Sequence, residues 1–177
     1  EKHKYLICVA TVNGPDRLER FLKSIQDNTK DFDYKVAITD DCSNSDLAER
    51  NYKLAVKYGC FYTRNEKRSG VPYSWNRATE LGDAEHLVIA NDDVEVVPCW
   101  LSAYESFRDA NRHLNLGVLA WPATGKREDK SIAANFIVGP DHSHIVTPIV
   151  ACAGYLFAAP RELFMRVGRF DERYFAT

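Results

Sequence analysis

The sequence lacks the long apolar segments that membrane-spanning and secreted chains carry. No apolar run approaches the ~20 residues needed to cross a bilayer, and the first residues do not contain a signal peptide's apolar core. The five cysteines are scattered without CxxC or His-paired zinc spacing, which indicates reduced thiols. We therefore predict a cytoplasmic protein with no membrane span.

An excess of positive charge is also missing. The chain has 23 Lys and Arg against 25 Asp and Glu, a formal net charge of -2. A protein that binds nucleic acid through bulk charge needs a concentrated basic surface, so we expect no nucleic-acid partner. With 177 residues, 45% of them hydrophobic, the chain is long enough for one domain with a proper core, and we expect a single domain over residues 1–177.

Strand and helix patterns alternate through the first two thirds of the chain. Apolar, partly β-branched runs predict strands at residues 5–10, 34–39, 60–63 and 86–90. Apolar residues at helical spacing lie between them, and Asp16 is expected to cap the first helix. This alternation predicts an α/β fold with a mostly parallel central sheet flanked by helices. Further strands are predicted at residues 117–121, 132–138 and 145–150.

Polar loops follow the predicted strands. Three of them, Thr11 to Asp16, Asp40 to Ser45 and Asn91 to Val94, come at carboxyl ends, and a basic loop at residues 64–70 joins them. Ligands of parallel sheets bind at the carboxyl ends of the strands, so these loops predict a site for a metal and a phosphorylated ligand. The alternative for the acidic strand end is a solvated loop that caps a helix.

Five segments, in order, resemble one known family. They are the TVN loop after the first strand, TDDCSNSD, RNEKRSGVPYSWNRATE, LVIANDDVEVVPCWL and CAGYLFAAPRELFMRVGRFDERYF. Together they resemble the N-terminal nucleotide-sugar half of family 2 glycosyltransferases, which have the GT-A (Rossmann-like) fold. The resemblance implies an inverting enzyme that binds a nucleotide-activated sugar through Mg²⁺ or Mn²⁺. It also implies a nucleotide-binding half at residues 1–113 and a sugar- and acceptor-side half at residues 114–177.

The resemblance assigns the nucleotide base to two of the loops. Thr11, Val12 and Asn13 match the first loop, which touches base and ribose. Asp41, with Asp40 beside it, matches the carboxylate that reads the base. A carboxylate can accept from the ring N–H of uracil, so a UDP-sugar is the expected donor. Alternatively, either aspartate caps the helix that follows.

The resemblance assigns the cation to Asp92 and Asp93. They match the family's Asp-x-Asp-type element, with Asn91 in place of a frequent acidic residue. Asp93 is the expected direct ligand of Mn²⁺ or Mg²⁺, and Asp92 is expected to face the ribose or a metal-bound water. Fewer carboxylates imply weaker metal binding.

Other site residues follow the same resemblance. Arg64 and Arg68 match cations that face the diphosphate or base, although either could be a solvated loop cation. Gly70 is expected to let the backbone turn, and Asn76 either hydrogen-bonds near the sugar or holds the loop. Gly154 falls where donor sugar and acceptor meet.

Two further assignments stay open. Trp121 falls near the expected meeting point of donor sugar and acceptor but is equally suited to the core. His142 and His144 have a spacing that a metal could use, although His-x-His inside a Gly-Pro turn is more typical of an exposed loop.

The acceptor is expected to be a carbohydrate or another hydroxyl compound. In the resembled family, the general base follows the FDERYF segment, so we expect it beyond Thr177 and expect this chain to be a C-terminally truncated, donor-binding portion without full transfer activity. Asp171 and Glu172 match the loop before the base. A nucleotide-sugar-binding module without transfer activity is one alternative. A nucleotidyltransferase is another, although TVNGPDRLERF offers the single Gly14 where such enzymes have a glycine-rich loop.

Overall fold

The computed structural model of the chain describes residues 1–113, 116–121, 134–135 and 155–174. The strands are β1 (Lys2–Thr11), β2 (Tyr34–Asp40), β3 (Phe61–Arg64), β4 (Asp83–Asn91), β5 (Val94–Glu95), β6 (Leu119–Ala120), β7 (Ala134–Asn135) and β8 (Leu156–Pro160). The helices are α1 (Pro15–Asn28), α2 (Ser45–Lys57), α3 (Val71–Glu80), α4 (Trp100–Ala110) and α5 (Arg161–Arg166). Apart from β7, the strands predicted at residues 132–138 and 145–150 lie outside the described residues.

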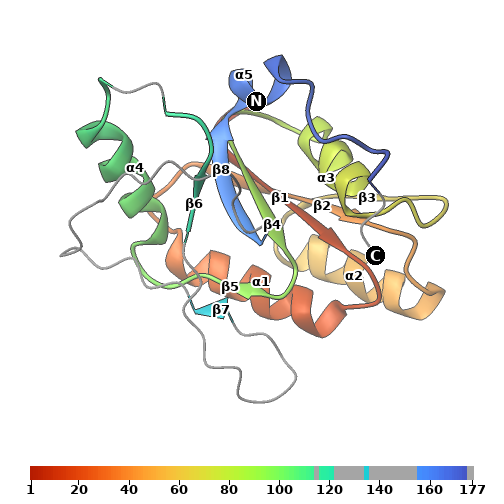
Figure 1. Ribbon diagram of the computed structural model, residues 1–177. Coiled ribbons are helices and arrows are strands. Elements are labelled where there is room, and N and C mark those ends of the chain that lie inside the picture. Colours follow the sequence, from red (N-terminus) through yellow and green to blue (C-terminus); the bar gives the residue numbers. More distant parts are fainter. Residues whose placement is uncertain (114–115, 122–133, 136–154, 175–177) are drawn as a thin grey trace.

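A six-stranded sheet in the order β3-β2-β1-β4-β8-β6 forms the centre of the molecule (Figure 1). Its first four strands are parallel, whereas β8 is antiparallel to both β4 and β6. The short strands β5 and β7 form a separate parallel pair. The predicted α/β fold with a mostly parallel sheet is therefore confirmed, and strands from the second half of the sequence complete the sheet.

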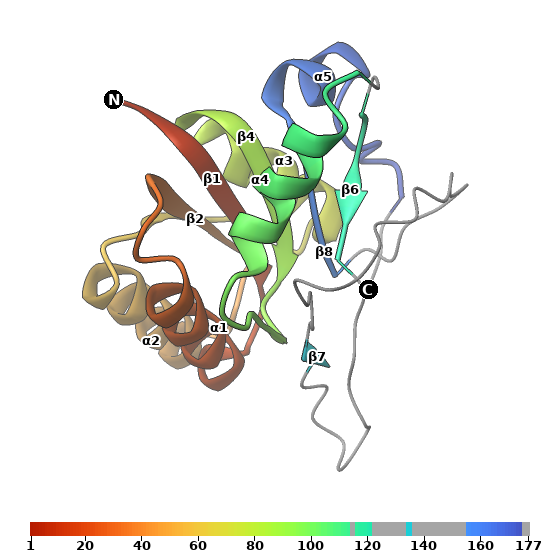
Figure 2. The ribbon, with the colours of Figure 1, turned by 90° about the vertical axis from the view of Figure 1, so that its left-hand side faces the viewer.

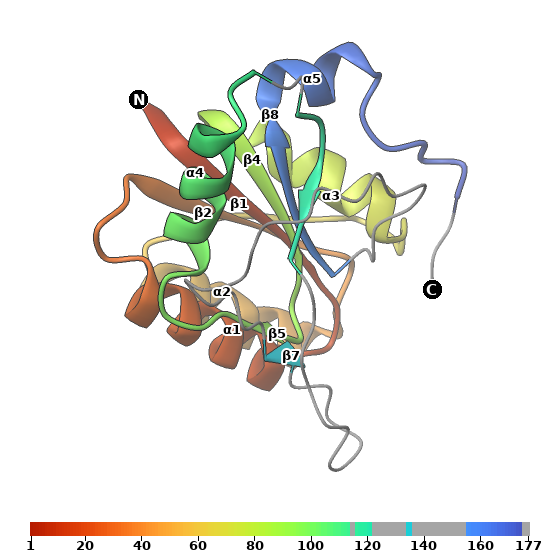
Figure 3. The same cartoon turned by 60° about the vertical axis from the view of Figure 1, so that its left-hand side comes forward.

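Helices cover both faces of this sheet. The side chains of β1 alternate between the faces, so Tyr5 and Ile7 join one apolar cluster while Leu6 and Cys8 join the other. The first cluster contains buried apolar residues of α1 and α4, and the second contains buried apolar residues of α3 and α5. Figures 2 and 3 show α1 and α2 side by side, away from α3 and α5. Burial on both faces explains why the central strands are continuous apolar runs.

The start of α1 differs from the prediction. Its first residue is Pro15, and Gly14 occupies the N-cap position without a side-chain hydrogen bond. Proline suits the first helical position because its missing N–H and fixed φ cost little there. Asp16 therefore lies inside the first turn, where its carboxylate accepts from Arg50 Nη2 at 2.5 Å, and the prediction that it caps the helix is wrong.

Two predictions about the whole chain can be compared with the described residues. The four cysteines in that part of the chain, Cys8, Cys42, Cys60 and Cys99, are free, as expected for reduced thiols. Within the same ranges, every helix is too short or too polar to span a bilayer.

Candidate functional site

The register of the sheet brings the polar loops to one edge. Thr11 pairs with Asp40 across β1 and β2, and Ala10 pairs with Asn91 across β1 and β4. A cavity of about 240 Å³ opens there, which we call the edge pocket. Six predicted residues line it, namely Thr11, Val12, Asp41, Arg68, Asp92 and Asp93. The other lining residues are Ala10, Arg17, Val71, Ser74 and Asn91.

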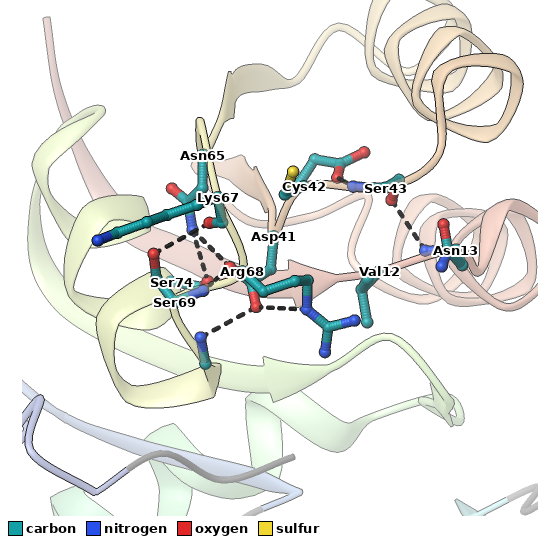
Figure 4. A network of polar contacts seen from close by, with 12 residues as sticks. Val12, Asn13, Asp41, Cys42, Ser43, Asn65, Lys67, Arg68, Ser69 and Ser74 are labelled. Carbon is teal, nitrogen blue, oxygen red and sulfur yellow. Dashed lines mark hydrogen bonds and ion pairs between the residues drawn. The ribbon is translucent and has the colours of Figure 1, made fainter.

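Asp41 directly follows β2 and accepts four hydrogen bonds (Figure 4). Asn65 Nδ2 and the Ser69 N–H donate to Oδ1, each at 2.8 Å. Arg68 Nε and the Gly70 N–H donate to Oδ2 at 3.2 and 3.0 Å. A carboxylate has about four lone-pair sites, so this carboxylate, 4% exposed, has a full set of donors. It ties the loop after β3 to the carboxyl edge of the sheet.

Gly70 is needed at the start of α3 for its backbone conformation. Its φ of 87° lies in the left-handed region that side chains with a Cβ rarely adopt, and α3 begins at the next residue. This turn aims the Gly70 N–H at Asp41. The expectation that Gly70 lets the backbone turn is therefore confirmed.

The Asp40 side chain points away from the edge pocket, toward α2 and β3. It is completely buried and accepts from the Ser43 N–H, Asn51 Nδ2 and the Tyr62 hydroxyl at 2.7, 2.8 and 3.1 Å. Burial, together with the neighbouring Asp40 carboxylate, raises the pKa of Tyr62, so the phenol stays a donor. Of the two adjacent aspartates, Asp41 lines the pocket, while Asp40 supports the loop into α2.

Asn13 and Arg64 connect the loops around the edge pocket. Asn13 has a φ of 50°, its N–H donates to Ser43 Oγ at 2.8 Å, and its Oδ1 accepts from the Asn44 N–H at 2.8 Å. Arg64 Nη2 donates to the Ser43 carbonyl at 2.7 Å. Both predicted residues therefore shape the loop that follows β2, and neither is among the residues that line the pocket.

Asp92 lies on the other side of the edge pocket and is held by α1. Thr11 Oγ1 donates to Asp92 Oδ2 at 2.7 Å. Arg17 Nε lies 3.2 Å from Oδ1, and Arg17 Nη2 lies 3.3 Å from Oδ2 and 3.3 Å from the Val12 carbonyl. Asp92 is 8% exposed, and burial raises its pKa, against the effects of Thr11 and Arg17.

Sequence reasoning missed Arg17. The sequence pattern places Arg17 in an amphipathic helix and predicts the phosphate-facing cations in the loop after β3 instead. A signal was available, because Arg17 lies in the first turn of a helix that directly follows a strand-end loop. Side chains of that turn can reach the carboxyl edge of the sheet.

The edge pocket contains some of the oxygen ligands that a hard cation such as Mg²⁺ or Mn²⁺ requires. Asp93 lines the edge pocket next to Asp92, and its charge contributes to the raised pKa of Asp92. Among the described residues, there is no cluster of three or more His, Cys, Asp or Glu that could hold a metal. Mg²⁺ and Mn²⁺ need one or two carboxylates when phosphate oxygens and water complete the shell, and Asp93 with Asp92 fits that requirement.

The remaining predicted residues lie elsewhere. Asn76 Nδ2 donates to the Phe170 carbonyl and to Glu172 Oε1 at 3.0 and 2.8 Å, so α3 holds the segment after α5. Trp121 is buried against Trp100, which makes it a core residue. Gly154 lies outside the described residues, as do both histidines of the His-x-His pair.

A larger cavity, of about 410 Å³, lies at the amino end of β1 beside α4. Four of its charged residues form two pairs, since Lys4 contacts Glu105 and Arg112 Nη2 lies 3.0 Å from Asp109 Oδ1, and the fifth, Arg108, contacts His86. Ligands of parallel sheets bind at the carboxyl ends of the strands. The edge pocket is therefore the candidate site, although it is smaller.

Comparisons with known proteins agree with this architecture. The family model "Glycosyl transferase family 2" matches residues 6–159. A search of curated proteins found no match. Among solved structures, a mannosyltransferase from Pyrobaculum calidifontis, PcManGT, in complex with GDP-Man and Mn²⁺, matches with a TM-score of 0.70 at 20% identity. That match covers 97% of this chain and 48% of the other.

Two structures of TarS from S. aureus also match. One, of residues 1–349, has a TM-score of 0.71 at 18% identity and covers 98% of this chain and 52% of that one. The other, in complex with UDP-GlcNAc, has a TM-score of 0.59 at 21% identity and covers 71% and 36%. This chain thus spans about half the length of the PcManGT structure and of the first TarS structure.

Proposed function

Because the chain belongs to glycosyl transferase family 2 and has the fold of the GT-A transferases, we propose that it binds a nucleotide-diphosphate sugar in the edge pocket. The sugar is transferred to the hydroxyl of a carbohydrate or other acceptor, with inversion at the anomeric carbon. The donor is a UDP-sugar. GDP is the competing nucleotide, because one matched structure is a complex with GDP-Man and another is a complex with UDP-GlcNAc.

The base and ribose occupy the side of the pocket formed by Val12, Asp41 and Arg68. Asp41 keeps Arg68 and the loop backbone in place through its four hydrogen bonds. Contact between uracil N–H and Asp41 then requires one of these donors to move. Arg68 is the candidate to do so, because its side chain is 46% exposed and its bond to Asp41 is the longest of the four.

The diphosphate occupies the side formed by Arg17, Asp92 and Asp93. Asp93, with Asp92 beside it, would hold Mn²⁺ or Mg²⁺. Such a cation, when bound, neutralises charge that grows on the diphosphate as the sugar bond breaks. Arg17 and Arg68 add fixed positive charge to the same pocket, where guanidinium groups suit phosphate oxygens.

One observation carries the proposal: three strand-end loops and the first turn of α1 place two guanidinium groups and three carboxylates around one cavity. That composition matches an anionic ligand that binds together with a cation. The family assignment favours a glycosyltransferase over a nucleotidyltransferase. A nucleotide-sugar-binding module without transfer activity shares the pocket and is separated by experiment.

The binding experiment is a calorimetric titration with UDP and GDP, each with and without Mn²⁺. We expect UDP to bind more tightly with Mn²⁺ and the gain to disappear in Asp93→Ala. Asp16→Ala is the matched control, because this exposed carboxylate on α1 pairs with Arg50 and does not line the pocket. Failure of both nucleotides to bind under every metal condition overturns the proposal.

A second experiment separates a transferase from a binding module. Release of UDP from a panel of UDP-sugars is measured with Mn²⁺, with and without carbohydrate acceptors, and the anomeric configuration of the product is read by NMR. Inverted product, whether transferred to the acceptor or to water, supports the enzyme. Tight, metal-dependent binding without turnover assigns this chain donor binding alone, as a binding module or as the donor-binding portion of a transferase.

A further inference from the structure

Two nitrogen atoms of the Arg17 side chain contact the Asp92 carboxylate, and one of them also contacts a backbone carbonyl. Nε and Nη2 lie 3.2 and 3.3 Å from the two carboxylate oxygens, and Nη2 also lies 3.3 Å from the Val12 carbonyl. A planar guanidinium that contacts both oxygens of a carboxylate fixes its orientation as well as its charge. Thr11 completes the set by donating to Asp92 Oδ2 at 2.7 Å.

The local backbone leaves space for this guanidinium. A Cβ on Gly14 would lie 2.4 Å from Arg17 Nη2 and 2.8 Å from Asp92 Oδ2, both closer than real Cβ contacts. The N-cap glycine of α1 therefore permits the contact between Arg17 and Asp92. An alanine at this position would displace the flexible end of Arg17 and crowd Asp92 Oδ2, so the two side chains would separate.

Charges in the edge pocket are arranged as two pairs and one additional carboxylate. Arg68 pairs with Asp41 and Arg17 pairs with Asp92, both at 3.2 Å, while Asp93 is the third lining carboxylate. A divalent cation that approaches Asp93 without nucleotide therefore meets the positive charge of Arg17, which is held against the neighbouring Asp92. A diphosphate meets the same charge as an attraction.

We propose that Arg17 is a built-in counter-cation of the donor site. It positions Asp92, weakens the binding of free divalent cations, and contributes positive charge to the diphosphate of the bound nucleotide. The role toward the diphosphate rests on the proposed function, whereas the effect on the free cation does not. The cation and the nucleotide consequently bind together more favourably than the cation binds alone.

The first measurement is titration of Mn²⁺ alone into wild type, Arg17→Gln and Arg20→Gln. Arg20 is the matched control, because it lies on the same helix, pairs with Glu95 at 3.5 Å and does not line the pocket. Removing a unit charge a few ångströms from a divalent ion strengthens binding by about tenfold even in a water-like dielectric. We expect that gain in Arg17→Gln and little change in Arg20→Gln.

Gly14→Ala provides a second variant that keeps the guanidinium but moves it from Asp92. We expect Mn²⁺ alone to bind more tightly here too, by less than in Arg17→Gln. A purely structural role for Arg17 predicts weaker Mn²⁺ binding in both variants. The proposal is overturned if Arg17→Gln binds Mn²⁺ with unchanged or weaker affinity, or if neither wild type nor Arg17→Gln binds Mn²⁺.

The second measurement is titration of UDP and GDP in EDTA, which removes divalent cations. Arg17→Gln should bind the nucleotide preferred by wild type about tenfold more weakly, because a charge-assisted contact to the diphosphate is lost. Equal affinity overturns the diphosphate role. If wild type binds neither nucleotide, even with Mn²⁺, the proposed function fails, and the titration with Mn²⁺ alone still decides the effect of Arg17 on the cation.

Discussion

Arg68–Asp41 and Arg17–Asp92 are both arginine–aspartate pairs at the carboxyl edge of the sheet, but their surroundings differ. Two of the four donors to Asp41 are backbone N–H groups of the loop that leads into α3. Within the part of the chain that the structure describes, the donors to Asp92 are side-chain groups, from Thr11 and Arg17. The first carboxylate therefore holds the backbone of its loop, whereas the second orients groups that already lie on regular elements. Substitutions can separate these two roles.

The largest effect on stability is expected at Asp41. Asp41→Asn replaces one acceptor oxygen by a donor that faces N–H groups, and buried donors without partners are costly. We expect the free energy of unfolding to fall by about 3 kcal/mol, measured by urea denaturation. Asp46→Asn, an exposed carboxylate in the first turn of α2, should change it by less than about 0.5 kcal/mol. Similar losses in the two variants would contradict a structural role for Asp41.

The two glycines beside these pairs give the next contrast. Gly70→Ala forces a Cβ into a φ of 87° and should cost about 1–2 kcal/mol of unfolding free energy. Gly14→Ala causes no such backbone strain, but its Cβ meets the movable end of Arg17 and the Asp92 carboxylate, so it should cost less than Gly70→Ala, about 0.5 kcal/mol. Urea denaturation of both variants tests this. If Gly14→Ala lost more unfolding free energy than Gly70→Ala, the contact between Arg17 and Asp92 would stabilise the fold more than the turn at Gly70 does.

Asp92→Asn should leave stability almost unchanged while affecting binding. Burial raises the pKa of Asp92, so its ionised form is disfavoured in the folded protein, and a neutral amide of the same shape removes that cost. We expect less than about 1 kcal/mol change in unfolding free energy, together with at least tenfold weaker UDP binding in Mn²⁺. Calorimetry and denaturation on the same preparation measure both quantities. A loss as large as that of Asp41→Asn would remove the distinction between the two pairs.

The smallest effect is the pH dependence that follows from the same pKa. Because the pKa of Asp92 is higher in the folded than in the unfolded chain, its stabilising contribution is complete below the unfolded value and is lost as pH rises through the folded one. Wild type should therefore lose stability relative to Asp92→Asn as the pH rises from about 4, the value for an unfolded aspartate, through the raised pKa of Asp92. Denaturation midpoints of both proteins at several pH values measure this effect. A gain in the stability of wild type relative to Asp92→Asn with rising pH would contradict the prediction.

Much of the framework of the site could be predicted from the order of residues. The apolar runs before Thr11, Asp41 and Asn91 identified buried strands, and parallel strands that end together bring their loops together. This is why six of the predicted residues line the edge pocket. The prediction was less complete for residues whose role depends on side-chain direction, such as Asn76, which holds the segment at Phe170.

The alternation of apolar runs and polar loops by itself determined the α/β fold, the parallel strands and the edge at which Asp41, Asp92 and Asp93 gather. Those properties depend on local periodicity, which a sequence displays directly. Only the tertiary structure decided that Asp41 has a full set of donors, that Asp40 faces the interior and that Arg17 contacts Asp92. Such pairings join residues as far as 75 positions apart, and each depends on how a helix or loop is packed against the sheet.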